Sequence, residues 1–207
     1  RFGRQKQVIK VAEDGSWKAM FTPMEADGKK YTISAECENN KIEYRNVVIG
    51  EVWLCSGQSN MAFMVKESSH KEQSLANLKG KDIRLYDMKP RVVTDNVEWD
   101  SIDLERLNRH DYYITTEWQE HNGKNTSAFS AVAYHFGAML ADSLKMPIGL
   151  ICNAVGGAPA EAFIDRKTIE FNPTLVDILY NWRENDMIQD WCRGRAAQNI
   201  TKSTNKL

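Results

Sequence analysis

The sequence has little cysteine, no long apolar run and no excess of charge of either sign. Its four cysteines show no paired C-x-x-C spacing and are too few for a disulfide scaffold. No run approaches the roughly 18 apolar residues that span a bilayer. A formal net charge of -1 offers no basic face for phosphate. These absences predict a protein that binds neither nucleic acid nor membrane.

Metal-ligand patterns are also missing. Histidine, cysteine and carboxylate residues do not recur at the spacings of metal sites, so we expect no metal and no other cofactor. We expect most of the cysteines to be buried thiols that pack as small apolar side chains; they are Cys37, Cys55, Cys152 and Cys192.

The composition is that of an ordinary globular protein. Hydrophobic residues make up 42% and charged residues 27% of 207 residues, enough chain for one large domain or for a domain with a smaller module. In residues 8–48, short apolar-polar alternations at 17–21 and 31–35 are separated by Asp14-Gly15 and Asp27-Gly28. Alternation between such turns predicts an antiparallel β module, too short for a complete sandwich.

From residue 50 the pattern changes to that of a parallel α/β sheet. The run "VVIGEVWLC" and the run "PIGLICNAVGG" are almost continuously apolar, as expected for strands covered on both faces. Helices are predicted over 72–78 and over 127–145, the second with Thr126 or Ser127 as its cap, and "IRLYDM" predicts a strand between them. Residues 174–193 predict a further helix, and 89–125 predict an irregular stretch, either a surface insertion that shapes a site or a plain excursion.

The segment "GEVWLCSGQSNM", residues 50–61, places Ser59 just beyond a buried strand. Parallel sheets bind ligands beyond the carboxyl ends of their strands, and Gly156-Gly157 follow another strand at that same edge. A serine hydroxyl needs a base and oxyanion donors to act as a nucleophile, and glycines can turn their amides toward an oxyanion. The alternatives are that Ser59 only caps a helix and that the glycines only make a tight turn.

The whole string resembles the nucleophile segment of the sialate O-acetylesterases and related carbohydrate acetylesterases, within the SGNH (GDSL-like) hydrolases. The stretches "DGSWKAMF", "FSAVAYHFGAMLADSLKMPIGLI" and "AVGGAPAEAFI" resemble successive parts of that family in the same order. The resemblance covers most of 17–164 and is weaker over 64–125. It implies a three-layer α/β/α sheet at 50–207, incomplete in this chain, after a small antiparallel β-sandwich module at 1–49.

By this resemblance, Ser59 is the nucleophile that attacks an acetyl ester. Its own amide would be one oxyanion donor, and the amide of Gly156 or Gly157 would be a second. Substrate-binding residues are not identified: Trp118, Trp182 and Trp191 could stack on a sugar or belong to the core. Glu161 and Asp165 could touch substrate or serve as acidic residues in the first turn of a helix.

The family's catalytic base is missing from the pattern. The histidines are His70, His110, His121 and His135, and none has an aspartate three residues before it, as the Asp-x-x-His segment of these hydrolases requires. We expect His135 to be a packed or half-exposed helix residue and the other three to be solvated. We therefore expect the chain to be the N-terminal part of a longer polypeptide, inactive alone, with the remaining C-terminal part as its partner.

Three functions stay open. The first is a serine esterase that removes O-acetyl groups from carbohydrates, either sialic acids or plant polysaccharides such as xylan. The second is a non-catalytic carbohydrate-binding or scaffold module, and the third is a lipase-like hydrolase, which would show a broader apolar surface around the serine. The resemblance alone implies an extracytoplasmic location, periplasmic or secreted.

Overall fold

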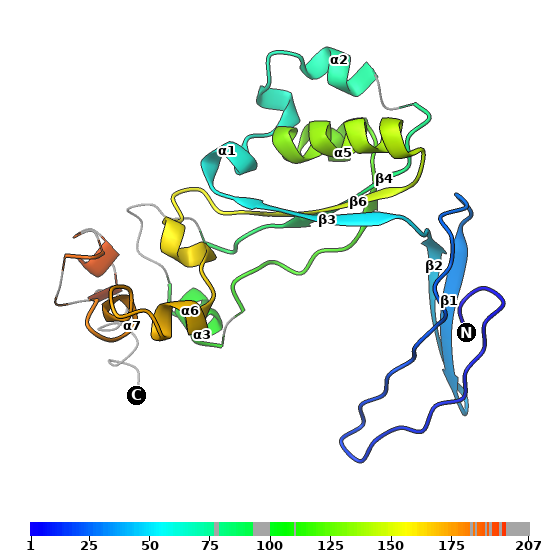
Figure 1. Ribbon diagram of the computed structural model, residues 1–207, viewed down its shortest axis with the longest axis horizontal. Helices are drawn as coiled ribbons and strands as arrows, with labels where there is room; N and C mark the ends of the chain where they lie inside the picture. The colour runs from blue at the N-terminus through cyan, green and yellow to red at the C-terminus, as the bar shows by residue number, and fades with distance from the viewer. Residues whose placement is uncertain are drawn as a thin grey trace.

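A computed structural model gives the arrangement of the chain (Figure 1). It describes residues 1–76, 79–92, 100–109, 111–182, 184, 186–188, 190, 192–194 and 196–197. The strands are β1 (Tyr31–Cys37), β2 (Asn40–Val47), β3 (Glu51–Gly57), β4 (Ile83–Met88), β5 (Gln119–Glu120) and β6 (Ile148–Ala154). The helices are α1 (Ser59–Ala62), α2 (Lys71–Ala76), α3 (Ser101–Asn108), α4 (Gly123–Ser127), α5 (Ala131–Leu144), α6 (Arg166–Glu170) and α7 (Asp177–Tyr180), with single 3₁₀ turns η1 (Val65–Glu67) and η2 (Ala160–Phe163).

The N-terminal part is built on a two-stranded antiparallel sheet of β1 and β2. The expected turns are present: Asp14 Oδ1 accepts the Ser16 amide and Asp27 Oδ1 accepts the Lys29 amide. The expected strand at 17–21 is wrong, because this stretch is irregular. It is held instead by glutamine side chains, since the Gln7 amide group bonds both backbone groups of Met20.

The second sheet has four strands in the order β3-β6-β4-β5. Strand β6 pairs in parallel with β3 on one side and with β4 on the other, while β5 joins the far edge antiparallel. The α/β class with a separate antiparallel sheet is therefore confirmed. The cap of α5 is Ser130, whose hydroxyl accepts the Ala133 amide, rather than the predicted Thr126 or Ser127. A separate short helix, α4, occupies 123–127.

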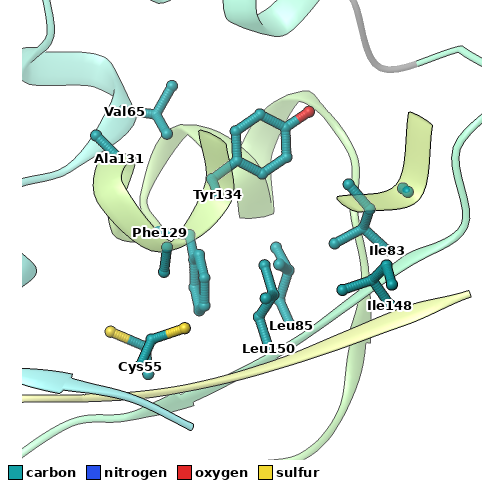
Figure 2. Close-up of a cluster of buried hydrophobic side chains, with 12 residues drawn as sticks. Cys55, Val65, Ile83, Leu85, Phe129, Ala131, Tyr134, Ile148 and Leu150 are labelled. Carbon is teal, nitrogen blue, oxygen red and sulfur yellow. The ribbon is translucent and has the colours of Figure 1, made fainter. Parts of the chain in front are cut away.

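The core lies between α5 and one face of this sheet (Figures 1 and 2). Figure 2 shows Phe129, just before α5, pointing toward Leu85 and Leu150 on the strands, whereas Tyr134 on α5 points away from the strands. Ile83, Ile148 and Leu150 are fully buried, and each side chain of that size contributes roughly 1.5–3 kcal/mol by leaving water. Burial on this face therefore fixes the spacing of β3, β6 and β4 beneath α5.

The opposite face of the sheet is open. Helices α1, α2 and α5 lie on one side of it, and within the described residues no helix covers the other (Figure 1). Val52 and Leu54 on β3 are 61% and 65% exposed. The prediction that β3 is covered on both faces is therefore wrong for this chain, because the described residues bury Cys55 on its α5 face and leave Val52 and Leu54 on the other face exposed. Strand β6 buries Ile148, Leu150 and Cys152 on the α5 face, whereas Ile151 on the other face is half-buried.

The predicted helix at 174–193 is not continuous. Helix α7 spans Asp177–Tyr180, and its backbone leaves helical geometry at Asn181 (φ -120°, ψ 15°). None of its residues is buried, so the apolar stripe lacks the packing that stabilises most protein helices. Within the described residues, no helix is both long enough and apolar enough to cross a bilayer.

A polar junction joins the hairpin to the larger sheet. Glu120 on β5 accepts from Lys30 at 3.1 Å and from Asn46 at 2.7 Å, and Arg84 on β4 lies 3.1 Å from the same carboxylate. The Asn46 amide, with Lys30 and Arg84 beside it, lowers the pKa of Glu120 below its ordinary 4.5. The contribution of Glu120 to the free energy of unfolding is thus present above pH 4.5, and it is lost as the pH falls through the lowered pKa.

Gly50 is required where the hairpin meets β3. A Cβ at this position would lie 2.0 Å from the Pro147 carbonyl oxygen, which accepts the Glu51 amide. We predict that Gly50→Ala lowers the free energy of unfolding by about 1–3 kcal/mol, measured by urea denaturation.

Gly123→Ala is the matched control, because a Cβ at Gly123 meets no atom within 4 Å. It should shift the urea midpoint little. Equal losses for both alanine variants would contradict the role of the close backbone approach.

Candidate active site

Ser59 lies at the carboxyl edge of the sheet, two residues after β3 ends. It is the first residue of α1 and is exposed. Its Oγ lies 3.3 Å from Gln58 Oε1, and Gln58, not Ser59, occupies the N-cap position, where no side chain caps the helix. The interpretation of Ser59 as a helix cap is therefore wrong, and its hydroxyl faces solvent.

The glycine turn lies beside Ser59. Gly57 pairs with Ala154 at the ends of β3 and β6, and the Val155 amide donates to the Gly57 carbonyl at 3.0 Å. Gln58 Nε2 then donates to the Ala158 carbonyl at 3.2 Å, so the residues flanking the glycines are tied to the residues flanking Ser59. Gly156 and Gly157 are both exposed, and Gly157 has φ +78°, a conformation that glycine adopts without strain.

A further polar pair at this edge was not anticipated from the sequence. Tyr113 Oη donates to Asn153 Oδ1 at 2.7 Å, and Asn153 is level with Ser56 of β3 in the register. The signal was the asparagine that interrupts the apolar run "LICNA" at the end of a strand. Its partner Tyr113 comes from the irregular 89–125 stretch, whose path only the folded structure shows.

The described histidines lie away from Ser59. His70 and His135 line a cavity between α2 and α5, where His135 Nε2 is 3.3 Å from Ser74 Oγ. The prediction that His121 is solvated is wrong, because its Nε2 is 2.7 Å from the Lys81 carbonyl and its Nδ1 is buried. His110 lies outside the described residues. Among the described histidines, therefore, none is hydrogen-bonded to the Ser59 hydroxyl.

The other residues that the sequence offered as possible substrate contacts are two carboxylates and three tryptophans. Asp165 caps α6 by accepting the Lys167 and Thr168 amides, and the Thr168 hydroxyl beside it lowers the pKa of its carboxyl. Glu161 lies in η2. Trp118 packs against Tyr86 on the open face of the sheet, with ring centroids 5.2 Å apart, Trp182 is half-buried after α7, and Trp191 lies outside the described residues.

Comparisons with known proteins point to one group of enzymes. Over 184 residues the chain is 29% identical to a sialate O-acetylesterase from Pongo abelii, and over 176 residues it is 29% identical to that of Homo sapiens. Its structure superposes on a carbohydrate acetylesterase from Xanthomonas citri with a TM-score of 0.67 and 25% identity, over 83% of this chain. The chain is similar to these acetylesterases. No protein-family model matches it.

The likeness to the acetylesterases covers most of this chain but a minor part of each relative. It extends over 82% and 80% of the chain, and over 33% and 31% of the primate enzymes. For the bacterial acetylesterase, 37% of that chain is covered. The chain therefore spans about a third of the length of the acetylesterases that it matches.

Two thiols close to the carboxyl edge of the sheet are kept protonated. Cys55 and Cys152 are buried register neighbours on β3 and β6. Burial, with smaller contributions from Asp87 and Cys55, raises the pKa of Cys152 to about 12. Since the thiolate is the reactive form, the Cys152 thiol is unreactive near neutral pH. Cys37 on β1 is exposed.

We predict that iodoacetamide at pH 8 modifies Cys37 in the folded protein at least about tenfold faster than Cys152. Unfolding in urea should remove the difference, because the Cys152 thiol is then exposed and burial no longer raises its pKa. Peptide mass spectrometry reports the modified sites. Similar rates at the two cysteines before unfolding would contradict the buried pairing of β3 with β6.

Proposed function

We propose that the protein is a serine esterase that removes O-acetyl groups from carbohydrates through an acetyl-Ser59 intermediate. The observation that carries the proposal is the exposed Ser59 hydroxyl at the carboxyl edge of β3, tied to the glycine turn by the Val155–Gly57 hydrogen bond. The relatives named as sialate O-acetylesterases and a carbohydrate acetylesterase support the same chemistry. Metal ligation is not invoked in this mechanism.

The reaction follows the double-displacement scheme of serine hydrolases. A histidine takes the Ser59 proton as Oγ attacks the acetyl carbonyl, and the amides of Ser59 and of Gly156 or Gly157 stabilise the oxyanion. The tetrahedral intermediate then collapses, the sugar oxygen leaves with the proton from the histidine, and acetyl-Ser59 remains. Water, deprotonated by the same histidine, attacks the acetyl group to form a second tetrahedral intermediate, which collapses as the histidine returns the proton to Ser59 Oγ and acetate leaves. Each oxyanion donor contributes on the order of 10²-fold in rate.

We propose that the histidine comes from an Asp-x-x-His segment outside residues 1–207, in the remaining C-terminal part of the polypeptide. The described histidines do not reach Ser59, and the relatives are about three times as long as the matched region. The open sheet face, with exposed Val52 and Leu54, is where we place that partner, because parallel sheets are covered on both faces in α/β proteins.

The same proposal divides the chain into a β module at 1–49 and the N-terminal portion of the esterase domain at 50–207. The hairpin and the larger sheet meet through the polar cluster around Glu120, as independent units do. On the resemblance alone, we also propose that the protein acts outside the cytoplasm.

Ser59→Ala should abolish acetate release in the native polypeptide that contains this chain, leaving less than about 1% of wild-type turnover. Loss of the hydroxyl removes the nucleophile without changing packing, because the side chain is exposed. Acetate release from O-acetylated sialic acids and from acetylated xylan oligomers is the measurement, and circular dichroism checks folding.

Ser69→Ala is the control, since Ser69 is also exposed and lies outside the site; it should keep wild-type turnover. Residual activity well above 1% in Ser59→Ala would refute the nucleophile. A wild-type protein that binds these sugars but releases no acetate would favour the non-catalytic carbohydrate-binding module, which the separation of the described histidines from Ser59 also supports.

Gly157→Ala tests the glycine turn. Its φ of +78° is strained for alanine, so the turn should shift and move its amides away from the oxyanion. We expect kcat to fall by about 10-fold or more with a smaller change in KM. Gly80→Ala provides a strained control away from the site, because Gly80 has φ +80° and open space around it. Equal kcat in the two variants would remove the glycine turn from the mechanism.

A further inference from the structure

Tyr113 and Asn153 form a hydrogen bond at the carboxyl edge of the sheet that no step of the esterase mechanism uses. Tyr113 Oη donates to Asn153 Oδ1 at 2.7 Å, and the two residues are 40 positions apart in the sequence. Both are half-buried. The bond therefore joins two separate parts of the chain, the segment before β5 and the end of β6.

Asn153 occupies the last position at which β6 pairs with strands on both of its sides. It is level with Ser56 of β3 and with Met88 of β4. One residue later, Ala154 still pairs with Gly57 of β3, but β4 has ended. The glycine turn thus begins where β6 loses β4 as a neighbour.

The Asn153 side chain lies on the face of the sheet opposite to α1. Successive side chains of a strand point to opposite faces, and Cys152 belongs to the core on the α5 side, so Asn153 points to the open face. Figure 1 shows α1, which begins at Ser59, on the α5 side. Asn153 therefore supports the end of β6 from behind, and its effect on the reaction passes through the backbone.

The Tyr113 hydroxyl is held in place from its own side. The Arg91 amide donates to the Tyr112 carbonyl at 2.9 Å. The Ile114 amide donates to the Lys89 carbonyl at 2.9 Å, so hydrogen bonds to the segment after β4 flank Tyr113 on both sides. The ring of Tyr112 packs edge-on against the ring of Tyr113, with centroids 5.0 Å apart. The hydroxyl is therefore a donor whose position is fixed before it meets its acceptor.

We propose that Tyr113, acting through Asn153, is a positioning residue for the oxyanion donors of the glycine turn. On the β3 side the turn is held by the hydrogen bond from the Val155 amide to the Gly57 carbonyl. On the β4 side Tyr113 holds the residue that precedes the turn. Oxyanion donors act by being in place before the charge develops, so a turn fixed on both sides stabilises the oxyanion better. The inference rests on the proposed function for its link to turnover.

The first test does not depend on turnover. Tyr113→Phe, made in the native polypeptide that contains this chain, removes the hydroxyl and keeps the ring. Hydrogen exchange at the Val155 amide should become about threefold faster or more, because β6 loses its hydrogen bond on the β4 side. Mass spectrometry of the peptide that carries Val155 is the measurement. Unchanged exchange overturns the proposal.

Tyr31→Phe is the matched control. Tyr31 Oη also donates to a side-chain oxygen, Asp27 Oδ2, at 2.9 Å, and Figure 1 shows β1 at the end of the sheet away from α1. This variant should leave both hydrogen exchange at Val155 and kcat unchanged. Equal effects of the two phenylalanine variants would assign the losses to general destabilisation and overturn the proposal.

The second test is kinetic and uses the O-acetylated sialic acids and acetylated xylan oligomers of the esterase assay. Tyr113→Phe should lower kcat about fivefold and leave KM within about twofold, because the oxyanion donors and not the bound substrate are disturbed. Asn153→Ala should give the same loss. The double variant should lose no more than either single variant, since each change breaks the same bond. Losses that multiply, or a raised KM at constant kcat, would overturn the proposal.

Gly157→Ala shows whether the effect passes through the glycine turn. In that background the turn is already displaced, so adding Tyr113→Phe should lower kcat by less than about twofold more. A further fivefold loss would place the action of Tyr113 elsewhere and overturn the proposal. Turnover that persists in Ser59→Ala refutes the esterase mechanism and, with it, the role of Tyr113 in catalysis. An inactive Ser59→Ala beside an unchanged kcat in Tyr113→Phe refutes only the positioning role.

Discussion

The parallel pairing of β3 with β6 is the constraint on which the candidate site depends. Seven register pairs run from Glu51–Ile148 to Gly57–Ala154, and the ladder continues through the Val155 amide to the Gly57 carbonyl. Because parallel strands end at the same edge, this ladder brings Ser59 next to a glycine turn about a hundred residues later in the chain. Without it, the serine and the glycines would be separate turns with no shared chemistry.

The ladder is held by an asymmetric core. Helix α5 covers one face and buries Ile83, Ile148 and Leu150 between itself and the strands, as Figure 2 shows. The other face exposes Val52 and Leu54. Burial of the α5 face positions the carboxyl edge of the sheet, where Ser59 lies. The open face offers an exposed apolar surface on which the proposed C-terminal partner could pack.

The edge also separates reactive from unreactive groups by burial. Ser59 is exposed at the end of β3, while the Cys152 thiol of the next strand is buried and has a pKa of about 12. Successive side chains of a strand point to opposite faces of the sheet, so one residue lies in the core and the next lies nearer to solvent. The same alternation places Asp87 on the α5 side of β4, level with Cys152 of β6.

Much of this architecture was predictable from local sequence. The strand "IRLYDM", the body of the helix at 131–144 and the strand before Gly156-Gly157 follow from apolar periodicity, because the residues that form each element also bury it. Periodicity failed where burial depends on distant partners. Residues 17–21 alternate without forming a strand, and the helix predicted over 174–193 is broken at Asn181, after the four residues of α7, none of which is buried.

The sequence by itself determined the residue types at the candidate site: a serine just beyond an apolar strand, paired glycines beyond another, and histidines without an aspartate three residues before them. Only the tertiary structure decided that Gln58 rather than Ser59 takes the cap position, that β3 is an edge strand, and that Tyr113 donates to Asn153. The physical reason is that strand order, cap geometry and such side-chain hydrogen bonds depend on contacts between segments far apart in the chain, which no local pattern of residues encodes.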